Sequence, residues 1–419
     1  MTIFERYLEK QILYQQFIYE DPDKNLQNII VIPCYNEPNI LPTLNSLISC
    51  KEPENPVEVL IVINSADNTD TEILEQNKKT IAEIKNLLIS HKSSKLKFHV
   101  ISIENIPNKF AGVGFARKVG MDEAIRRFNS ISNTKGIITG FDADSLVAEN
   151  YLVEIENLFQ NKSKLNGCSI YFEHPIKGSE FSDIIYKKII EYELYLRYYS
   201  LALKQTGFPY YFHTVGSSFA VKAETYCKQG GMNRKKAGED FYFLQKIMPL
   251  GDYEYLNTTT VFPSSRPSDR VPFGTGAFIK SNIEYPNRAY LTYNFEVFLN
   301  LNQFFKQIDK LFNIKDFKSG AFNLHESLVQ FLHKNEFSKS LNEINANTTN
   351  LNTFKKRFFQ YFDAFRVLKY QNFAHENFYK KIPINIAVNE YLKHSENKNL
   401  CSENAKELLK NLRRLEKIG

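Results

Sequence analysis

Short apolar runs alternate with amphipathic segments between residues 28 and 159. The runs IIVI at 29–32, VLIVI at 59–63 and GIIT at 136–139 contain many β-branched residues and no polar alternation. Such runs are typical of parallel strands that helices cover on both faces. Helical spacing follows the successive runs, at 41–50, 70–90, 114–128 and 150–159. The alternation predicts an α/β fold with a Rossmann-like, mostly parallel, doubly wound sheet and ligands at the carboxyl ends of its strands.

The regions on either side depart from this pattern. Residues 1–24 predict an N-terminal helix with a polar exit at Asp21-Pro22-Asp23, because proline disfavours helix in the residue before it. After residue 282 the segments predict helices with no strands between them, and a polar loop at 342–352. We therefore expect an N-terminal helix over 1–24, an α/β domain over 25–281 and a helical C-terminal region over 282–419.

Composition narrows the class of protein. Hydrophobic residues make up 43% of the 419 residues and charged residues 24%, as in folded globular proteins. The net charge of +6 favours anionic partners only weakly and predicts no nucleic-acid binding. The five cysteines are scattered without a CxxC pair, which disfavours a disulfide framework and favours a reducing, cytoplasmic setting. The first residues lack the apolar core of a signal peptide.

Two acids follow the apolar run GIIT at 136–139. Asp142 and Asp144 lie one residue apart, directly after the GIIT run. Paired carboxylates at a strand end suit Mg²⁺ or Mn²⁺ and leave coordination positions for phosphate oxygens. His213 is a candidate third ligand, although a structural histidine is the simpler interpretation. A loop or helix cap is the alternative interpretation of the acid pair.

Two further segments offer groups for a nucleotide. Pro33, Tyr35 and Glu37 end the first predicted strand, where they can hold a base or ribose; a strand-to-helix turn is the alternative. Gly112-Val113-Gly114 leads to Arg117 at the start of a helix, where a guanidinium can bind pyrophosphate. Because Arg117 stands where the third glycine of a GxGxxG fingerprint would be, dinucleotide binding is disfavoured.

Charged residues later in the chain complete the candidate set. Glu239 and Asp240 open a predicted helix, where they either partner its N-terminus or, in the case of Asp240, act as a general base. The segment at 263–276 is dense in Pro, Gly, Ser and Arg. It is either a solvated turn or a lid whose Arg266 or Arg270 clamps a diphosphate.

The joint spacing of these motifs resembles a family 2 glycosyltransferase of the GT-A fold, over about residues 28–265. The motifs are P-C-Y-N-E at 33–37, G-x-A-R at 114–117, D-A-D-S at 142–145, G-G-M at 230–232 and G-E-D at 238–240. The resemblance implies transfer of a sugar from a nucleotide-sugar donor, with UDP or GDP as the nucleotide, to a hydroxyl acceptor. It also implies a divalent cation, Mg²⁺ or Mn²⁺, and inversion at the anomeric carbon.

The resemblance assigns roles residue by residue. It implies that Asp144 is the principal metal ligand, that Asp142 contacts ribose or metal, and that Asp240 takes the acceptor proton. The donor would be held by Pro33, Tyr35, Glu37 and Arg117. Two positions depart from the family pattern: Asn64 stands where an acid usually contacts the base, and Lys118 stands where Asn is frequent.

Several alternatives stay open. A retaining transferase would use the same metal site. A sugar nucleotidyltransferase would carry a glycine-rich loop after the first strand, where this chain has PCYNEPN. A noncatalytic nucleotide-sugar sensor, or a scaffold in polysaccharide assembly, is the alternative outside enzymes. The acceptor is expected to be a carbohydrate or a lipid-linked hydroxyl, and the Tyr-rich, basic helix at 181–205 leaves a peripheral contact with the inner membrane surface open.

Overall fold

The computed structural model describes residues 1–11, 13–270, 272, 274–285, 287–315 and 317–418, and it divides into two compact units. The first unit contains Met1–Tyr186, Thr214–Ser281 and Lys417–Gly419. The second contains Lys187–His213 and Asn282–Glu416. The segment 187–213 therefore belongs with the later helices, although its place in the sequence falls within the region 25–281.

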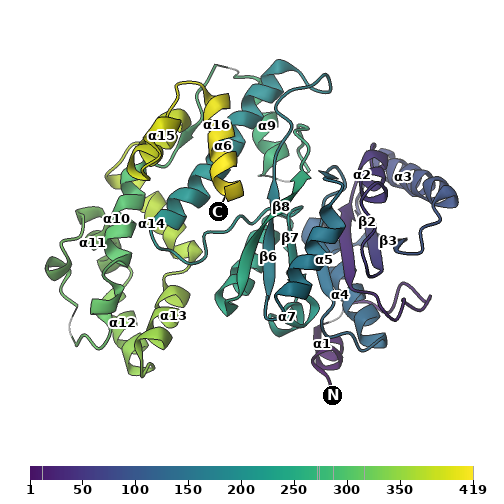
Figure 1. Ribbon diagram of the computed structural model, residues 1–419, viewed down its shortest axis with the longest axis horizontal. Helices are drawn as coiled ribbons and strands as arrows, with labels where there is room; N and C mark the ends of the chain where they lie inside the picture. Colours follow the sequence, from purple (N-terminus) through teal and green to yellow (C-terminus); the bar gives the residue numbers. More distant parts are fainter. Residues whose placement is uncertain (12, 271, 273, 286, 316, 419) are drawn as a thin grey trace. The chain divides into compact units, whose positions relative to one another are not determined.

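The first unit is built on an eight-stranded sheet with the order β3-β2-β1-β4-β7-β6-β8-β5. Neighbouring strands pair in parallel except at β7, which is antiparallel to β4 and β6, and at β5, which is antiparallel to β8. The strands are β1 (Asn28–Cys34), β2 (Val57–Ala66), β3 (Leu96–Ile106), β4 (Ile137–Gly140), β5 (Leu146–Val147), β6 (Gly167–Phe172), β7 (Phe219–Lys222) and β8 (Tyr253–Phe262). The predicted mostly parallel α/β sheet is confirmed (Figure 1).

Helices alternate with the first strands as the sequence pattern predicts. The helices of this unit are α1 (Ile3–Gln11), α2 (Leu41–Ile48), α3 (Thr71–Ser90), α4 (Val113–Ser130), α5 (Tyr151–Asn161), α7 (Ala223–Lys228) and α8 (Glu239–Ile247), with a 3₁₀ turn at Met248–Leu250. Helix α4 packs against β1 and β2, and β1 and β2 are buried almost throughout because helices and neighbouring strands cover their apolar side chains.

The N-terminal helix is shorter than the sequence pattern predicts. Helix α1 ends at Gln11, and residues 13–24 are not helical. The backbone amides of Phe17 and Ile18 donate to the Glu123 carboxylate on α4, so these amides bond to a side chain instead of to helical carbonyls. Helix α1 itself packs beside α4 and α7 (Figure 1).

The second unit is helical, as predicted for the C-terminal region. Phe rings fill much of its interior, among them Phe304 and Phe358, both buried. The polar stretch 342–352 was expected to be a loop, but helix continues to Ala346 and resumes at Leu351. Two short strands also form here. The elements are α10 (Phe295–Phe305), α11 (Glu326–Lys334), α12 (Phe337–Ala346), α13 (Leu351–Tyr361), α14 (Ala364–Asn377), α15 (Ile384–His394), 3₁₀ turns at Ile308–Leu311, Ser319–Phe322 and Lys398–Leu400, and strands β9 (Leu291–Thr292) and β10 (Ile382–Pro383).

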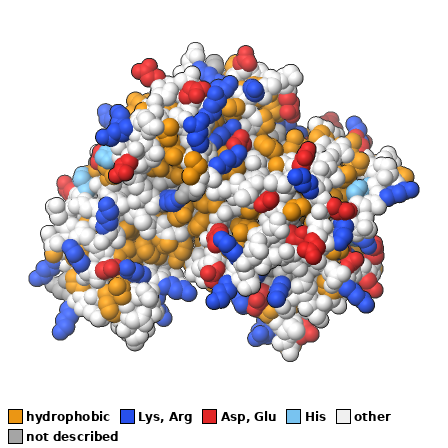
Figure 2. All heavy atoms as spheres, viewed as in Figure 1, with side chains coloured by type: hydrophobic (Ala, Val, Ile, Leu, Met, Phe, Trp, Pro, Cys, Tyr) orange, Lys and Arg blue, Asp and Glu red, His pale blue; other side chains and the backbone are white. Residues whose placement is uncertain are grey.

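Three helices include residues on both sides of the division between the units. Helix α6 (Asp183–Gln205) lies mostly in the second unit, α9 (Thr275–Ile283) mostly in the first, and α16 (Ala405–Ile418) mostly in the second. Basic and acidic side chains are interspersed over the visible face of the molecule (Figure 2). Among the described residues, no helix combines the length and the apolar character that spanning a membrane requires.

Candidate functional site

The acid pair lies directly after β4, as predicted. Asp142 and Asp144 are both half-buried, and Ala143 between them is buried. The Ala143 carbonyl accepts a hydrogen bond from Thr43 Oγ1 of α2 at 2.9 Å. This bond ties the backbone between the two acids to α2, the helix that follows β1.

Arg117 joins Asp142 to the predicted catalytic helix. Its Nη2 donates to Asp142 Oδ1 and its Nη1 donates to Glu239 Oε1. The guanidinium lies against Gly216, where an added Cβ would come within 2.4 Å of Nη2. Any larger residue at 216 would displace the guanidinium, so Gly216 makes room for the bridge. Burial raises the pKa of Glu239, and the Arg117 charge counteracts that rise.

Asp240 follows Glu239 at the start of α8. Its Oδ1 accepts a hydrogen bond from the backbone amide of Phe241 at 2.7 Å. Burial and the adjacent Glu239 charge raise the pKa of Asp240 to about 7, although Arg117 lowers it in part. A carboxyl group with a pKa near neutrality can accept and release protons at physiological pH, as a general base must.

Glu37 is held by two arginines from the segment after β8. Arg266 Nη1 donates to Glu37 Oε1 at 2.9 Å and its Nη2 donates to Oε2, which makes the pair bidentate. Arg270 Nη1 lies 3.2 Å from Glu37 Oε2 and donates to the Tyr35 carbonyl at 3.1 Å. Burial alone would raise the pKa of Glu37, but the two guanidinium groups hold it below its usual value.

The same arginines reach the acid pair. Nη2 of Arg266 and Nη2 of Arg270 each lie 3.4 Å from Asp144 Oδ2. Burial and the charge of nearby Asp142 raise the pKa of Asp144 to about 6, against a lowering by both arginines. The segment at 263–270 thus contacts the ends of β1 and β4 together.

The end of β1 is positioned by α3. Asn36 adopts a left-handed conformation with φ of 47°, and its amide donates to Asn77 Oδ1 at 2.9 Å. Thr80 Oγ1 donates to the Glu37 carbonyl at 2.7 Å. Pro33 and Tyr35, predicted to contact the nucleoside, are half-buried on this same stretch. Asn64 is buried near the end of β2, the strand next to β1.

The charged side chains at the ends of β1 and β4 and at the start of α8 form a cluster with a net negative charge. Its carboxylates are Glu37, Asp142, Asp144, Glu239 and Asp240, and its cations are Arg117, Arg266 and Arg270. Five carboxylates against three guanidinium groups leave two negative charges when all are ionised. A divalent cation would offset both. Mg²⁺ binds in proteins through one or two carboxylates together with substrate phosphates, so the Asp142–Asp144 pair fits such an ion.

The described residues hold no ready-made metal cage. Among them, no group of three or more His, Cys, Asp or Glu side chains is arranged to bind a metal. His213, the predicted third ligand, belongs to the second unit, where its Nε2 lies 3.0 Å from Glu416 Oε1. The structure therefore places the other predicted site residues in the first unit and His213 in the second, where it has an acidic partner.

The Gly112–Gly114 motif packs against protein. An added Cβ on Gly114 would lie 2.3 Å from the Lys235 carbonyl oxygen and 3.0 Å from Glu239 Cβ. The glycine therefore lets the segment that precedes α8 approach the start of α4, which carries Arg117. The small residues of this motif were predicted to allow a close approach to the backbone. In the structure the group that approaches Gly114 is another segment of this protein, the one that precedes α8.

A polar cluster on α4 was not predicted from the sequence. Lys118 Nζ lies 2.9 Å from Asp122 Oδ2, and Tyr7 of α1 donates to Asp122 Oδ1 at 2.6 Å. Tyr226 of α7 donates to that same oxygen at 2.7 Å. Lys118, the departure from the family pattern, thus helps to fix α1 and α7 to α4. The presence of Lys and Asp four residues apart was the only sequence signal for this cluster.

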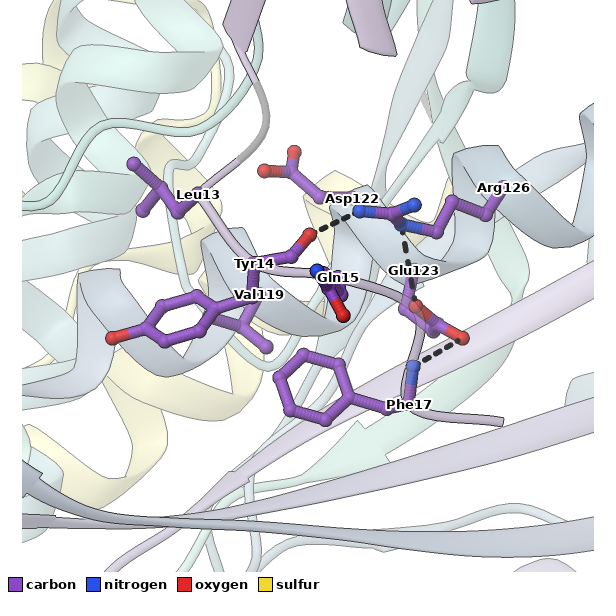
Figure 3. A pocket seen from close by; sticks show the side chains of 8 residues that line it. All are labelled: Leu13, Tyr14, Gln15, Phe17, Val119, Asp122, Glu123 and Arg126. Carbon is purple, nitrogen blue, oxygen red and sulfur yellow. Dashed lines mark hydrogen bonds and ion pairs between the residues drawn. The ribbon is translucent and has the colours of Figure 1, made fainter. Parts of the chain in front are cut away.

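A shallow pocket lies beside α4, and none of the residues that line it is a predicted site residue (Figure 3). Arg126 donates to the Tyr14 carbonyl, and its Nε lies 3.6 Å from Glu123 Oε2. These contacts tie the stretch after α1 to α4. The pocket is lined by Leu13, Tyr14, Gln15, Phe17, Val119, Asp122, Glu123 and Arg126.

The known proteins of similar structure share little sequence with this chain. No protein-family model matches the chain, and no curated protein sequence matches it. The structure is similar to the crystal structure of S. aureus TarS residues 1–349 in complex with UDP-GlcNAc, with a TM-score of 0.37 and 13% identity over 93% of this chain and 90% of that one. The complex of the same fragment with UDP gives a TM-score of 0.36 at the same identity and coverage.

Proposed function

We propose that this protein is a glycosyltransferase that moves a sugar from a nucleoside-diphosphate sugar to a hydroxyl acceptor. One observation carries the proposal. Asp240, a carboxyl group with a pKa of about 7, is joined through Glu239 and Arg117 to the acids at the end of β4. A general base and a candidate diphosphate site therefore belong to one connected network, as a transfer between two substrates requires. The motif resemblance to family 2 glycosyltransferases supports the same activity.

The donor is proposed to bind at the ends of β1, β2 and β4. Pro33, Tyr35 and Asn64 would contact the nucleoside, and Asn64 can both donate to and accept from a base, so UDP and GDP are both candidates. Arg266 and Arg270 are proposed to turn from Glu37 and Asp144 to the donor diphosphate. A guanidinium group can bind a phosphate through two parallel hydrogen bonds, just as it binds a carboxylate.

A divalent cation, Mg²⁺ or Mn²⁺, is proposed at Asp144 and Asp142. When bound, such an ion would offset the charge that develops on the leaving diphosphate. Arg117 holds Asp142 in place, and the two arginines beside Asp144 supply positive charge to the same region. The chain's own contribution is thus an electrostatic environment that is fixed before the substrates react.

Asp240 is proposed to take the proton from the acceptor hydroxyl as that oxygen attacks the anomeric carbon. A single displacement of this kind inverts the anomeric configuration. A retaining transferase with the same donor site is the alternative within enzymes, and a noncatalytic nucleotide-sugar-binding scaffold is the alternative outside them. The raised pKa of Asp240 favours the catalytic option, since a binding scaffold needs no proton acceptor.

The test combines donor binding with turnover. Thermal unfolding of the protein is measured with UDP, GDP and their sugars, with and without Mn²⁺, because a ligand that binds only the folded state raises the melting temperature. We expect one nucleotide sugar to stabilise the protein more with Mn²⁺ than without it, and Asp144→Ala to remove that difference. NMR of the transferred sugar then identifies the anomer. No stabilisation by any nucleotide sugar would contradict the proposal.

A further inference from the structure

Four exposed cations gather beside the helix that carries Asp240. They are Lys109, Arg234, Lys235 and Lys236, here named the basic rim. In the part of the chain that the structure describes, none of the four forms an ion pair with a carboxylate. Lys118, on the neighbouring helix α4, is instead paired with Asp122.

Aromatic rings and an amide hold the basic rim in place. The Cζ of Arg234 lies 4.3 Å from the centre of the Phe110 ring, and the Nζ of Lys109 lies 4.8 Å from it. The Nζ of Lys235 lies 3.8 Å from the centre of the Tyr242 ring. The Nζ of Lys236 donates to Asn108 Oδ1 at 3.0 Å. Cation–π contacts and an amide orient the charges without neutralising them.

The basic rim is connected to the catalytic helix through short contacts. Asn233 Nδ2 donates to the Glu239 carbonyl at 2.9 Å, and the Lys235 amide donates to Asn233 Oδ1 at 3.0 Å. The Lys235 carbonyl also packs on Gly114 near the start of α4. The rim residues at 234–236 therefore lie only a few positions before Asp240, the proposed base, in the sequence.

Like charges gathered without acidic partners repel one another, and a bound anion relieves that repulsion. The donor's diphosphate already has Arg266, Arg270 and a proposed cation at the end of β4. The basic rim adjoins α8, on which the acceptor's hydroxyl would meet Asp240. The positive charge of the basic rim would therefore complement negative charge on the acceptor.

We propose that the acceptor is an anionic glycan, one that carries phosphate or carboxylate groups near the hydroxyl that is modified. This inference rests on the proposed function for the role of Asp240, and it names the class of substrate. The Tyr242 ring is exposed and the Phe110 ring is half-buried, and both have cations beside them. These rings would pack against the sugar faces between the charged groups.

The test measures binding of three oligosaccharides of equal length, one phosphorylated, one carboxylated and one neutral, to the full chain at low and high salt. We expect the wild type to bind one or both anionic oligosaccharides more tightly than the neutral one, with an affinity that falls as salt rises. Replacing all four rim residues with Gln should weaken anionic binding about tenfold or more, since exposed ion pairs contribute modestly and four are lost. Nucleotide-sugar affinity should not change.

A matched control replaces four exposed lysines elsewhere in the first unit, Lys24, Lys78, Lys85 and Lys92, with Gln. This variant carries the same change in net charge and should bind the anionic oligosaccharides as the wild type does. Equal loss in both variants would mean that net charge alone is responsible, and would overturn the inference. Circular dichroism of each variant establishes that it is folded. The salt dependence of binding is measured on the wild-type protein, so this part of the test does not depend on whether a variant folds.

The outcomes separate this inference from the proposed function. Equal affinity of the wild type for neutral and anionic oligosaccharides would overturn the anionic acceptor and leave glycosyl transfer untouched. Loss of nucleotide-sugar binding in the rim variant would assign the cations to the donor, and would also overturn it. Rim-dependent binding of anionic oligosaccharides by a protein that binds no nucleotide sugar would support the anionic-glycan site while contradicting the proposed enzyme.

Discussion

The Arg117 guanidinium donates to the Glu239 carboxylate in a pair whose side chains are each only 3% exposed. The contact joins the start of α4 to the start of α8. Because a second nitrogen of Arg117 donates to Asp142, one side chain aligns the helix of the proposed base with the end of β4. Removal of this arginine would affect both the stability of the fold and the geometry of the site.

We expect Arg117→Ala to destabilise the protein by about 3 to 5 kcal/mol, because it leaves the buried Glu239 charge without its partner. Arg117→Lys should recover part of the stability but little activity, since a single ammonium does not reproduce the two-pronged contact. Urea unfolding and initial rates provide the measurements. Arg126→Ala, on the same helix but 24% exposed, is the control and should cost less. Equal losses for the two positions would contradict the bridge.

Asp240→Asn is expected to lower kcat by roughly 10²- to 10⁴-fold, the usual contribution of a general base. Donor affinity should stay close to that of the wild type, because the proposed donor contacts lie on other residues. Rates and nucleotide-sugar binding measured on one preparation test both expectations. Near-normal kcat in the variant would show that the base is another residue.

The same substitution should alter how stability depends on pH. The pKa of Asp240 is raised from 3.8 to about 7 in the folded protein. Between these values the folded state holds a proton more tightly than the unfolded state, so this group's contribution to stability falls as pH rises from about 4 to about 7. The melting temperature of Asp240→Asn relative to wild type should therefore be higher at pH 8 than at pH 5. Asp252→Asn, at an exposed position outside the site, is the control substitution.

Activity should rise with pH through about 7. A general base works only when it is deprotonated, so kcat/KM should fall tenfold for each pH unit below the pKa of Asp240 in the free enzyme. A pH profile of kcat/KM between 5 and 9 at constant ionic strength is the measurement. A profile that stays flat from pH 5 to 8 would rule out Asp240 as the titrating base.

The arginines after β8 should affect stability and donor binding together. Arg266→Ala is expected to destabilise the protein by about 1 to 3 kcal/mol, since it deprives the buried Glu37 carboxylate of a bidentate partner while Arg270 remains nearby. If these arginines also hold the diphosphate, KM for the donor should rise in both Arg266→Ala and Arg270→Ala. Lys280→Ala, whose ion pair with Asp269 is exposed, is the control. A donor KM unchanged in both variants would remove the arginines from the donor site.

Much of the site could be placed from sequence because it lies at the ends of strands. The apolar runs near 29–32, 59–63 and 136–139 become β1, β2 and β4, which are neighbours in the sheet. Acids that follow parallel strands must collect at one edge, so Glu37 and Asp142–Asp144 were expected together. The N-terminal helix was overestimated, because the amides of residues 17 and 18 bond to a Glu123 side chain that lies more than 100 residues away.

The sequence by itself determined the alternation of strands and helices and the edge at which the acids lie, because hydrophobic periodicity reports local conformation and the face that is buried. Only the tertiary structure decided the partners of the charged groups. Arg117 meets Glu239 across 122 residues, and Glu37 meets Arg266 across 229. It also decided that His213 pairs with Glu416 within the second unit. A pair between distant segments forms only where packing brings their backbones together, and no local pattern in the sequence encodes that approach.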